Sequence, residues 1–365
     1  MAAPSTASLR PPVTDLDRAP IVVAWEVTRA CGYRCVHCRA DAQPRRSPRE
    51  LDLAEGMRMI DDLAAFDGSI LVLTGGDPLT RPDLEDLTAH ATRRGLRVAL
   101  TPSATPRVTD ARIRSLAAAG VRRVALSLDG ATAATHDGMR RLPGSYARTL
   151  GILESVRDAG LPIQVNSTIT RATVGEIDQL AEVVAGLGPA MWSVFFLVSV
   201  GRGREEDMLS PAAHEEAFER LADLDERLPF RVKVTEAPPF RRVLAQRAAR
   251  RGTPPPPDQM VPVRDGQGFM FVSHEGDVCP SGFLPVSAGN VRDTSPVAIY
   301  RDSELFRSLR DADRLGGKCG RCGFRRLCGG SRARAWALGG DPLGEDPTCI
   351  HEPPPATDQE ETHRC

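Results

Sequence analysis

Nine cysteines are the residues of this 365-residue chain best suited to carry chemistry. Three of them, Cys31, Cys35 and Cys38, follow a C-x3-C-x2-C spacing. Three thiolates this close together can hold a four-iron cluster while leaving one iron without a protein ligand, whereas a structural cluster uses four thiolates. The alternative is a zinc site with His37 as a fourth ligand, although a histidine between two ligands makes simultaneous coordination strained.

A second set lies near the end of the chain. Cys319, Cys322 and Cys328 form a C-x2-C-x5-C core, and Cys349 follows. Four thiolates either complete one iron–sulfur cluster or form a structural zinc site. An odd number of cysteines without an export signal argues against a disulfide framework, so the two sets indicate a metalloprotein.

The elements that must position the first set are visible between residues 21 and 200, where apolar β-branched runs alternate with helical patterns. The predicted strands are residues 21–28, 70–74, 97–101, 121–128, 162–170 and 191–200. The predicted helices are residues 49–65, 82–94, 110–119, 146–159 and 174–185. This alternation predicts parallel strands joined by right-handed helical crossovers.

Both a doubly wound sheet and an incomplete barrel fit that alternation. The unusual residues fall at the ends of the first, second, fourth and fifth strands, and these ends ring one mouth in a barrel. The segments concerned are residues 31–38, 75–78, 127–129 and 166–168. We therefore predict an α/β fold, a partial (β/α)6 TIM-like barrel, followed by a small cysteine-rich α+β domain.

The domain boundaries follow from composition. A proline-rich linker, GTPPPPD and the residues after it, covers residues 252–260 and separates the barrel with its bridging helices, 21–251, from an auxiliary domain, 261–351. Residues 1–20 are an N-terminal extension and residues 352–365 a polar tail expected to be disordered. The auxiliary domain has few apolar residues, so bound metal is expected to supply part of its stability.

Charge and hydropathy exclude several classes of protein. The 47 Lys and Arg residues balance 48 Asp and Glu residues, which excludes a strongly basic nucleic-acid binder. The longest apolar run is much shorter than the roughly 18 residues that a membrane span needs. No secretory signal is visible in the first 20 residues. The composition predicts a cytoplasmic protein with neither nucleic acid nor membrane as a partner.

Together these motifs resemble the radical S-adenosylmethionine (radical SAM) enzymes. The family's C-x3-C-x-aromatic-C motif matches Cys31, Cys35, His37 and Cys38, and the resemblance implies that His37 leans on the adenine of SAM. It also implies a [4Fe-4S] cluster whose open iron binds the methionine moiety of SAM. One electron then splits SAM, and the 5′-deoxyadenosyl radical abstracts a substrate hydrogen.

Further cofactor contacts are implied by the same resemblance. Gly75-Gly76-Asp77-Pro78 is similar to the family's Gly-Gly-Glu-Pro motif, which binds the amine of SAM; Asp77 is one methylene shorter, so this role falls mainly to Gly75 and Gly76. Ser127 and Asp129 correspond to ribose and carboxylate contacts. Taken alone, each of these motifs is also an ordinary turn at the end of a strand.

Additional candidates lie at the ends of the later strands. Asn166 is a candidate ribose contact on the fifth strand. His136, Arg140 and Arg141 fall in a predicted polar loop that either caps the site or is merely solvated. Arg202, after the sixth strand, is either a partner for a carboxylate or a surface residue.

The second cysteine set resembles the auxiliary-cluster region of the SPASM group of radical SAM enzymes, which has a C-x2-C-x5-C-x3-C pattern. Arg332 stands where the last cysteine of that pattern would be. The resemblance therefore implies one auxiliary [4Fe-4S] cluster held by Cys319, Cys322, Cys328 and Cys349, and two clusters in total. Cys279 is then free, and Cys365 is an unliganded residue of the tail.

The segments TRACGYRCVHCRADA and CGGSRARAW look closest to the tetrapyrrole-modifying and peptide-maturase branches. The expected function is oxidative modification of a tetrapyrrole or a ribosomal peptide, with a flavodoxin or ferredoxin as low-potential electron donor. The alternative is a zinc-binding scaffold or regulatory protein without catalytic activity.

Overall fold

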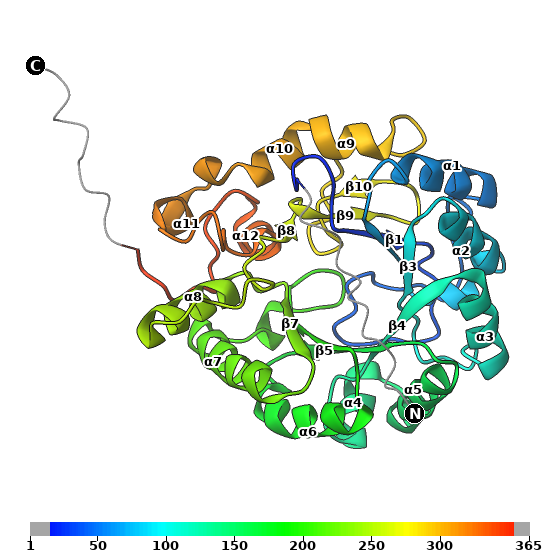
Figure 1. Ribbon diagram of the computed structural model, residues 1–365, viewed down its shortest axis with the longest axis horizontal. Coiled ribbons are helices and arrows are strands. Elements are labelled where there is room, and N and C mark those ends of the chain that lie inside the picture. Colours follow the sequence, from blue (N-terminus) through cyan, green and yellow to red (C-terminus); the bar gives the residue numbers. More distant parts are fainter. Residues whose placement is uncertain (1–14, 354–365) are drawn as a thin grey trace, which may run out of the picture.

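Seven parallel strands, β1 to β7, pair in chain order in the computed structural model, which describes residues 15–353. They are β1 (Val22–Glu26), β2 (Ile70–Thr74), β3 (Arg97–Leu100), β4 (Val121–Ser127), β5 (Ile163–Ile169), β6 (Met191–Phe196) and β7 (Arg231–Thr235). Helices from the connecting segments form a ring outside the curved sheet (Figure 1). They are α1 (Leu53–Leu63), α2 (Leu84–Arg93), α3 (Asp110–Ala119), α4 (Ala133–Arg140), α5 (Ser145–Asp158), α6 (Ile177–Leu187), α7 (Pro211–Arg227) and α8 (Pro239–Arg251).

The sheet continues beyond β1 with strands from the C-terminal part of the chain. β9 (Gly268–Val272) pairs in parallel with β1, and β10 (Val278–Cys279) pairs antiparallel with β9. The short β8 (Arg264–Asp265) also pairs with β9. The sheet therefore runs β10-β9-β1-β2-β3-β4-β5-β6-β7, and the predicted partial barrel is confirmed.

The remaining elements complete this arrangement. α9 (Pro296–Asp302) and α10 (Glu304–Arg310) follow β10, and α9 contacts α1. α11 (Gly317–Arg321) and α12 (Arg332–Gly339) lie with β8 on the side of the ring between β10 and β7 (Figure 1). Four single turns of 3-10 helix join these elements: η1 (Pro78–Thr80), η2 (Val174–Glu176), η3 (Glu205–Asp207) and η4 (Ala312–Arg314).

Buried and half-buried residues alternate along β5, so one face of the strand lies in the core and the other faces the inside of the barrel. In β5 the residues Ile163, Val165, Ser167 and Ile169 are buried, whereas Gln164, Asn166 and Thr168 between them are half-buried. Successive side chains of a strand point to opposite faces, so one face of β5 packs against helices and the other is polar. Asn166 is in register with Ser127 of β4, which places both on the polar face.

One expectation is wrong in this region. Residues 133–140 form helix α4, not a polar loop. The hydroxyl of Thr132 caps the first turn by accepting from the amide of Thr135 at 3.2 Å, and His136 and Met139 supply the buried face. The glycine in HDGM concealed this pattern, because glycine lowers the helix propensity of a short segment.

The proline-rich segment 252–260 is attached to the barrel. Gly252 ends α8 in a left-handed conformation with a φ of 63°. Beyond it, Arg231 of β7 donates from Nε to Asp258 Oδ2 at 3.1 Å. This contact fixes the path of the chain from α8 back towards β9, so the C-terminal strands reach the opposite edge of the sheet.

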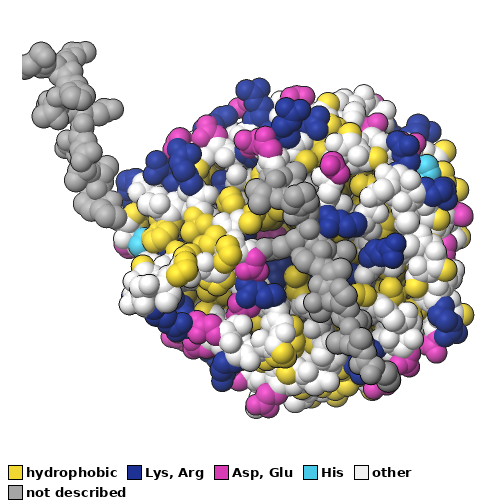
Figure 2. All heavy atoms as spheres, viewed as in Figure 1, with side chains coloured by type: hydrophobic (Ala, Val, Ile, Leu, Met, Phe, Trp, Pro, Cys, Tyr) yellow, Lys and Arg dark blue, Asp and Glu magenta, His cyan; other side chains and the backbone are white. Residues whose placement is uncertain are grey.

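The surface of the molecule matches its balanced composition. Figure 2 shows Lys and Arg side chains interspersed with Asp and Glu over the face drawn. No helix of residues 15–353 is long and apolar enough to cross a membrane.

The pairing of β9 with β1 predicts that the C-terminal segment and the barrel unfold together. Met270 of β9 is fully buried in the main core with Trp25, so Met270→Ala should lower the free energy of unfolding by about 2–5 kcal/mol. Denaturant titration followed by tryptophan fluorescence measures this, since Trp25 and Trp192 lie in the barrel and Trp336 lies on α12. Ile350→Ala, at an exposed position, is the control. If the C-terminal segment of Met270→Ala unfolded in a separate transition and the unfolding of the barrel did not change, this result would contradict the shared sheet.

Candidate active site

The first cysteine set lies in a loop that leaves β1 and closes on itself. The amide of Cys31 donates to the carbonyl of Gln43 at 2.8 Å, and the amide of Gln43 donates to the carbonyl of Arg29 at 2.8 Å. Both ends of the loop are thus held together at the carboxyl end of β1. The three cysteines lie between them, at the mouth of the barrel, as the sequence predicted.

The turn after β2 supports this loop from one side. Its amides donate to the chain that leads into the cysteines, Gly76 to the carbonyl of Thr28 at 2.8 Å and Asp77 to that of Ala30 at 2.7 Å. A Cβ atom on Gly76 would lie 2.6 Å from the carbonyl oxygen of Ala30, and one on Gly75 2.3 Å from that of Thr28. Only glycine permits this approach, so the two glycines position the cysteine loop.

Asp77 is engaged within the same turn. Its buried carboxylate accepts from the hydroxyl of Thr105 at 2.6 Å and from the amide of Leu79 at 3.2 Å. Burial raises the pKa of Asp77, while these hydrogen bonds act in the opposite direction. The side chain therefore caps η1, and both of its oxygens already have partners.

The sulfur atoms have specific polar neighbours. Cys31 Sγ lies 3.5 Å from Ser103 Oγ and accepts from the amide of Tyr33 at 3.3 Å. Arg140 on α4 donates to Cys35 Sγ at 3.5 Å. Burial raises the pKa of both thiols, whereas the Arg140 guanidinium lowers that of Cys35. Hydrogen-bond donors and positive charge at sulfur favour the thiolate, which is the form that binds metal.

Asp129 joins the cysteine loop to the neighbouring strands. The carboxylate is almost completely buried and lies 2.6 Å from Nη2 of Arg140. It also accepts from the amide of Thr168 at 2.8 Å, and His37 Nε2 lies 3.6 Å away. Burial acts to raise the pKa of Asp129, but the guanidinium charge of Arg140 and the hydrogen bond from the amide of Thr168 hold that pKa below its usual value. Asp129 is thus an ionised anchor for α4, β5 and the cysteine loop.

Two histidines near this anchor are neutral. Burial lowers the pKa of His37 and of His136 to about 4. The amide of Asp129 donates to Nδ1 of His136 at 3.1 Å, which leaves the proton on Nε2. In the described part of the chain, His37 Nδ1 and His136 Nε2 are buried without a hydrogen-bond partner. Such unpaired polar atoms beside three free thiols fit a site for a polar cofactor.

Arg202 fixes the back of the loop. Its Nε donates to the carbonyl of Cys35 at 3.0 Å, and Nη1 lies 3.1 Å from Asp41 Oδ1. Nη2 is buried without a partner among the described residues. From the sequence, Arg202 was expected to be either a surface residue or a partner for a carboxylate. In the structure it contacts the cysteine loop.

Of the other predicted residues, Ser127 and Asn166 lie together on adjacent strands just before Asp129 and Thr168. Asn166 accepts from Gln164 Nε2 at 2.8 Å. For Arg141 the sequence left a role in capping the site and a solvated position both open; the structure places it exposed at the end of α4 with a φ of 51°. Ser103 was missed: it follows β3, whose end carries a short polar run, TPSAT, that is common in ordinary loops.

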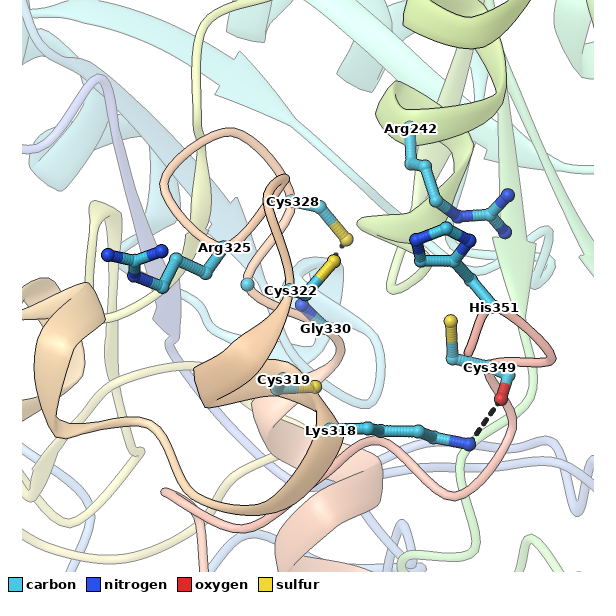
Figure 3. A pocket seen from close by; sticks show the side chains of 10 residues that line it. Arg242, Lys318, Cys319, Cys322, Arg325, Cys328, Gly330, Cys349 and His351 are labelled. Atoms are coloured by element: carbon cyan, nitrogen blue, oxygen red, sulfur yellow. Dashed lines mark hydrogen bonds between the residues drawn. The ribbon is translucent and has the colours of Figure 1, made fainter. Parts of the chain in front are cut away.

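The second cysteine set lines a single pocket, formed by Cys319, Cys322, Cys328 and Cys349 together with Arg242, Lys318, Arg325, Gly329, Gly330 and His351 (Figure 3). Backbone amides donate to three of the sulfurs: Asp346 to Cys319 at 3.3 Å, Phe324 to Cys322 at 3.4 Å and Gly330 to Cys328 at 3.4 Å. Amide–sulfur hydrogen bonds of this kind stabilise thiolate ligands of iron–sulfur clusters. The four cysteines therefore fit a fully ligated cluster.

Cys279 lies apart from this pocket. It is buried in β10 beside Ala24 and Phe271, and burial raises the pKa of its thiol to about 12. Among residues 15–353 no three His, Cys, Asp or Glu side chains are close enough to share one metal ion.

Comparison with known proteins identifies the class of this site. Residues 25–184 match the model of the radical SAM superfamily. An AdoMet-dependent heme synthase from Methanosarcina barkeri is 40% identical over 93% of this chain and 98% of that protein. The Fe-coproporphyrin III synthase of the same organism is 29% identical over 91% of this chain and 88% of that protein. The mycofactocin maturase from Mycobacterium tuberculosis is 30% identical over 91% of this chain and 83% of that protein.

Solved structures share the fold. Streptococcus suis SuiB bound to its precursor peptide SuiA matches with a TM-score of 0.71 at 15% identity, over 92% of this chain and 76% of that chain. Native anSMEcpe with bound AdoMet and a peptide matches with a TM-score of 0.68 at 15% identity, over 90% of this chain and 94% of that chain.

The chain belongs to the radical SAM superfamily. It is an enzyme that uses a [4Fe-4S] cluster and SAM, as the cysteine motif predicted. The alternative of a zinc scaffold without catalytic activity is therefore set aside.

The packing of the glycine turn predicts a specific defect. Gly76→Ala should lower stability by about 1–3 kcal/mol, because its Cβ would collide with backbone at Arg29 and Ala30. It should also reduce iron bound at the first cysteine set. Gly32→Ala is the matched control, since a Cβ there has nothing within 4 Å. Thermal unfolding and iron analysis of the two variants check this, and equal behaviour would refute the positioning role.

Proposed function

We propose that this protein is an AdoMet-dependent heme synthase, which converts a tetrapyrrole precursor into heme by radical chemistry. The observation that carries the proposal is the 40% identity to the Methanosarcina barkeri heme synthase along nearly the full length of both chains. The mycofactocin maturase is less similar, at 30% identity over 83% of its length. Peptide modification is the second candidate function.

The three cysteines of the first set would hold the SAM-binding cluster, and Cys319, Cys322, Cys328 and Cys349 an auxiliary cluster. When bound, the first cluster and SAM together supply a radical that abstracts hydrogen. This chain's residues hold that cofactor in place. Arg140 and the amide of Tyr33 would stabilise the thiolates of Cys35 and Cys31, and Ser103 Oγ lies beside the latter.

SAM would lie against the ends of β2, β4 and β5. We assign the contact to its amine to the carbonyls of Gly75 and Gly76, not to Asp77, since both oxygens of Asp77 are engaged. Ser127 and Asn166, which are in register on adjacent strands, would contact the ribose, and His37, which is neutral and has an unpartnered Nδ1, would contact the adenine. Asp129 would act indirectly, by fixing His37 and Arg140.

The substrate chemistry requires an electron acceptor. Vinyl groups of heme form from propionate side chains when one hydrogen atom, one carbon dioxide and one electron leave each chain. An auxiliary cluster held by the four cysteines of the second set would have no iron open to ligands and would supply an acceptor for that electron. A flavodoxin or ferredoxin in the cytoplasm is the proposed source of the electron that activates SAM.

Anaerobic incubation with reductant, SAM and Fe-coproporphyrin III tests this function. The expected products, measured by mass spectrometry, are 5′-deoxyadenosine and heme. Cys35→Ala should form neither, because its first cluster lacks a ligand, while the second cysteine set keeps its fold. Cleavage of SAM without heme formation from this or related iron tetrapyrroles would reject heme synthesis and favour a peptide substrate. Undiminished cleavage in Cys35→Ala would reject the assignment of the site.

A further inference from the structure

Two buried arginines, Arg264 and Arg332, lie against the pocket formed by the second cysteine set. In the described part of the chain, neither of them forms an ion pair with a carboxylate. Arg332 is fully buried and Arg264 is 5% exposed. A buried cation without a counter-charge is strongly unfavourable, so these residues call for an anion nearby.

Arg332 reaches a sulfur of the pocket directly. Its Nη2 donates to Cys319 Sγ at 3.5 Å. The rest of its guanidinium donates only to backbone carbonyls, with Nη1 at 2.6 Å from Gly344 and 3.0 Å from Pro342. This arginine occupies the position where the SPASM-like cysteine pattern would have its fourth member. A potential ligand is thus replaced by a positive charge.

Arg264 lies against the turn that follows Cys328. A Cβ atom on Gly329 would be 2.8 Å from Nη1 of Arg264, and one on Gly330 would be 2.6 Å from Nη2 of Arg332. Both glycines have a φ of 68°, so the turn is left-handed and lets the two guanidinium groups approach the cysteines. Arg264 Nε and Nη1 are buried and donate to no partner among the described residues.

Other charges around the pocket are already balanced. Arg242 forms a bidentate pair with Glu215 at 2.6 and 2.8 Å, and Arg325 lies 3.2 Å from Asp313. Asp346 is buried near three of the cysteines, but it lies 3.7 Å from Arg334 and accepts from the amides of Ser331 and Thr348. Asp265 is also buried and accepts from the amide of Ala333 at 3.1 Å; its charge interacts with those of Arg264 and Arg332, but burial raises the pKa of its carboxyl. Arg264 and Arg332 therefore bring positive charge to the pocket without a direct ion pair.

We propose that Arg264 and Arg332, here termed the arginine collar, raise the reduction potential of the auxiliary cluster. Four thiolates around a four-iron core carry net negative charge that increases by one on reduction, and nearby positive charge stabilises the reduced form more than the oxidised form. The collar thereby favours transfer of one electron from an oxidised substrate radical to this cluster. The inference rests on the proposed auxiliary cluster but not on the proposed substrate.

Redox titration of the reconstituted protein, followed by electron paramagnetic resonance without substrate, tests the collar. Arg264→Met removes the charge but keeps much of the side chain's volume, and the buried Nε and Nη1 have no partners to lose. At a fixed potential near the midpoint, the ratio of reduced to oxidised auxiliary cluster should fall about tenfold, which for one electron corresponds to about 59 mV. The first cluster's potential should not change.

Two further variants separate charge from structure. Arg264→Lys keeps the charge and should restore most of the potential. Arg326→Met is the matched control, because Arg326 is two residues from Cys328 but is 70% exposed and lies 2.7 Å from Asp313; its removal should leave the potential unchanged. An unchanged potential in Arg264→Met, or an equal shift in both clusters, would overturn the inference.

Thermal unfolding provides a second readout if Arg264→Met binds the cluster poorly. The cluster-free variant should be at least as stable as cluster-free wild type, because an unpaired buried cation is gone. The cluster-loaded variant should be less stable than loaded wild type. If the substitution destabilised both forms equally, Arg264 would have only a packing role, and the proposal would fail.

Discussion

The buried carboxylate of Asp129 is the point at which four segments of the chain meet. It holds Arg140 of α4, the backbone of Thr168 in β5, and His37 of the cysteine loop, while its own amide fixes His136. Arg140 in turn contacts Cys35 Sγ. Breaking one partner of a buried pair typically costs about 3–5 kcal/mol, so this anchor ties the position of the first cysteines to the integrity of the barrel wall.

The auxiliary cysteines depend on the same sheet by a different route. β9 pairs with β1, the strand that leads into the first cysteine loop, and β8 leads into the wall of the second pocket through Arg264. The two cysteine sites are consequently attached to one curved sheet. A protein that must move electrons between clusters and substrate gains from such attachment, because it holds the participating groups at fixed separations.

Much of this arrangement could be predicted from the sequence. Alternating β-branched and amphipathic segments gave the six strands, and the cysteine spacing identified both sites. The pairing of β9 with β1 was not predicted, because pairing between residues far apart in sequence depends on tertiary contacts that no local pattern reveals. Helix α4 was missed for a local reason. Gly138 lies between its two buried residues, His136 and Met139, and glycine lowers helix propensity.

The roles of individual side chains were the least predictable part. Asp77 and Asp129 are predicted cofactor contacts, and the structure adds that each carboxylate also has partners within the protein. Ser103 and the collar arginines became visible only when distant segments came together. A sequence indicates which residue types are available, whereas hydrogen-bond partners and burial determine which of them remain free to bind a ligand.

We expect the cluster of the first cysteine set to have one iron open to SAM and the cluster of the second set to be fully ligated by cysteines. Electron paramagnetic resonance of the chemically reduced protein, recorded before and after addition of SAM, tests it most directly. Two signals are predicted, one that changes on addition of SAM and disappears in Cys35→Ala, and one that is insensitive to SAM and disappears in Cys322→Ala. A single signal, or two signals that are both unchanged by SAM, would contradict this difference between the two cysteine sites.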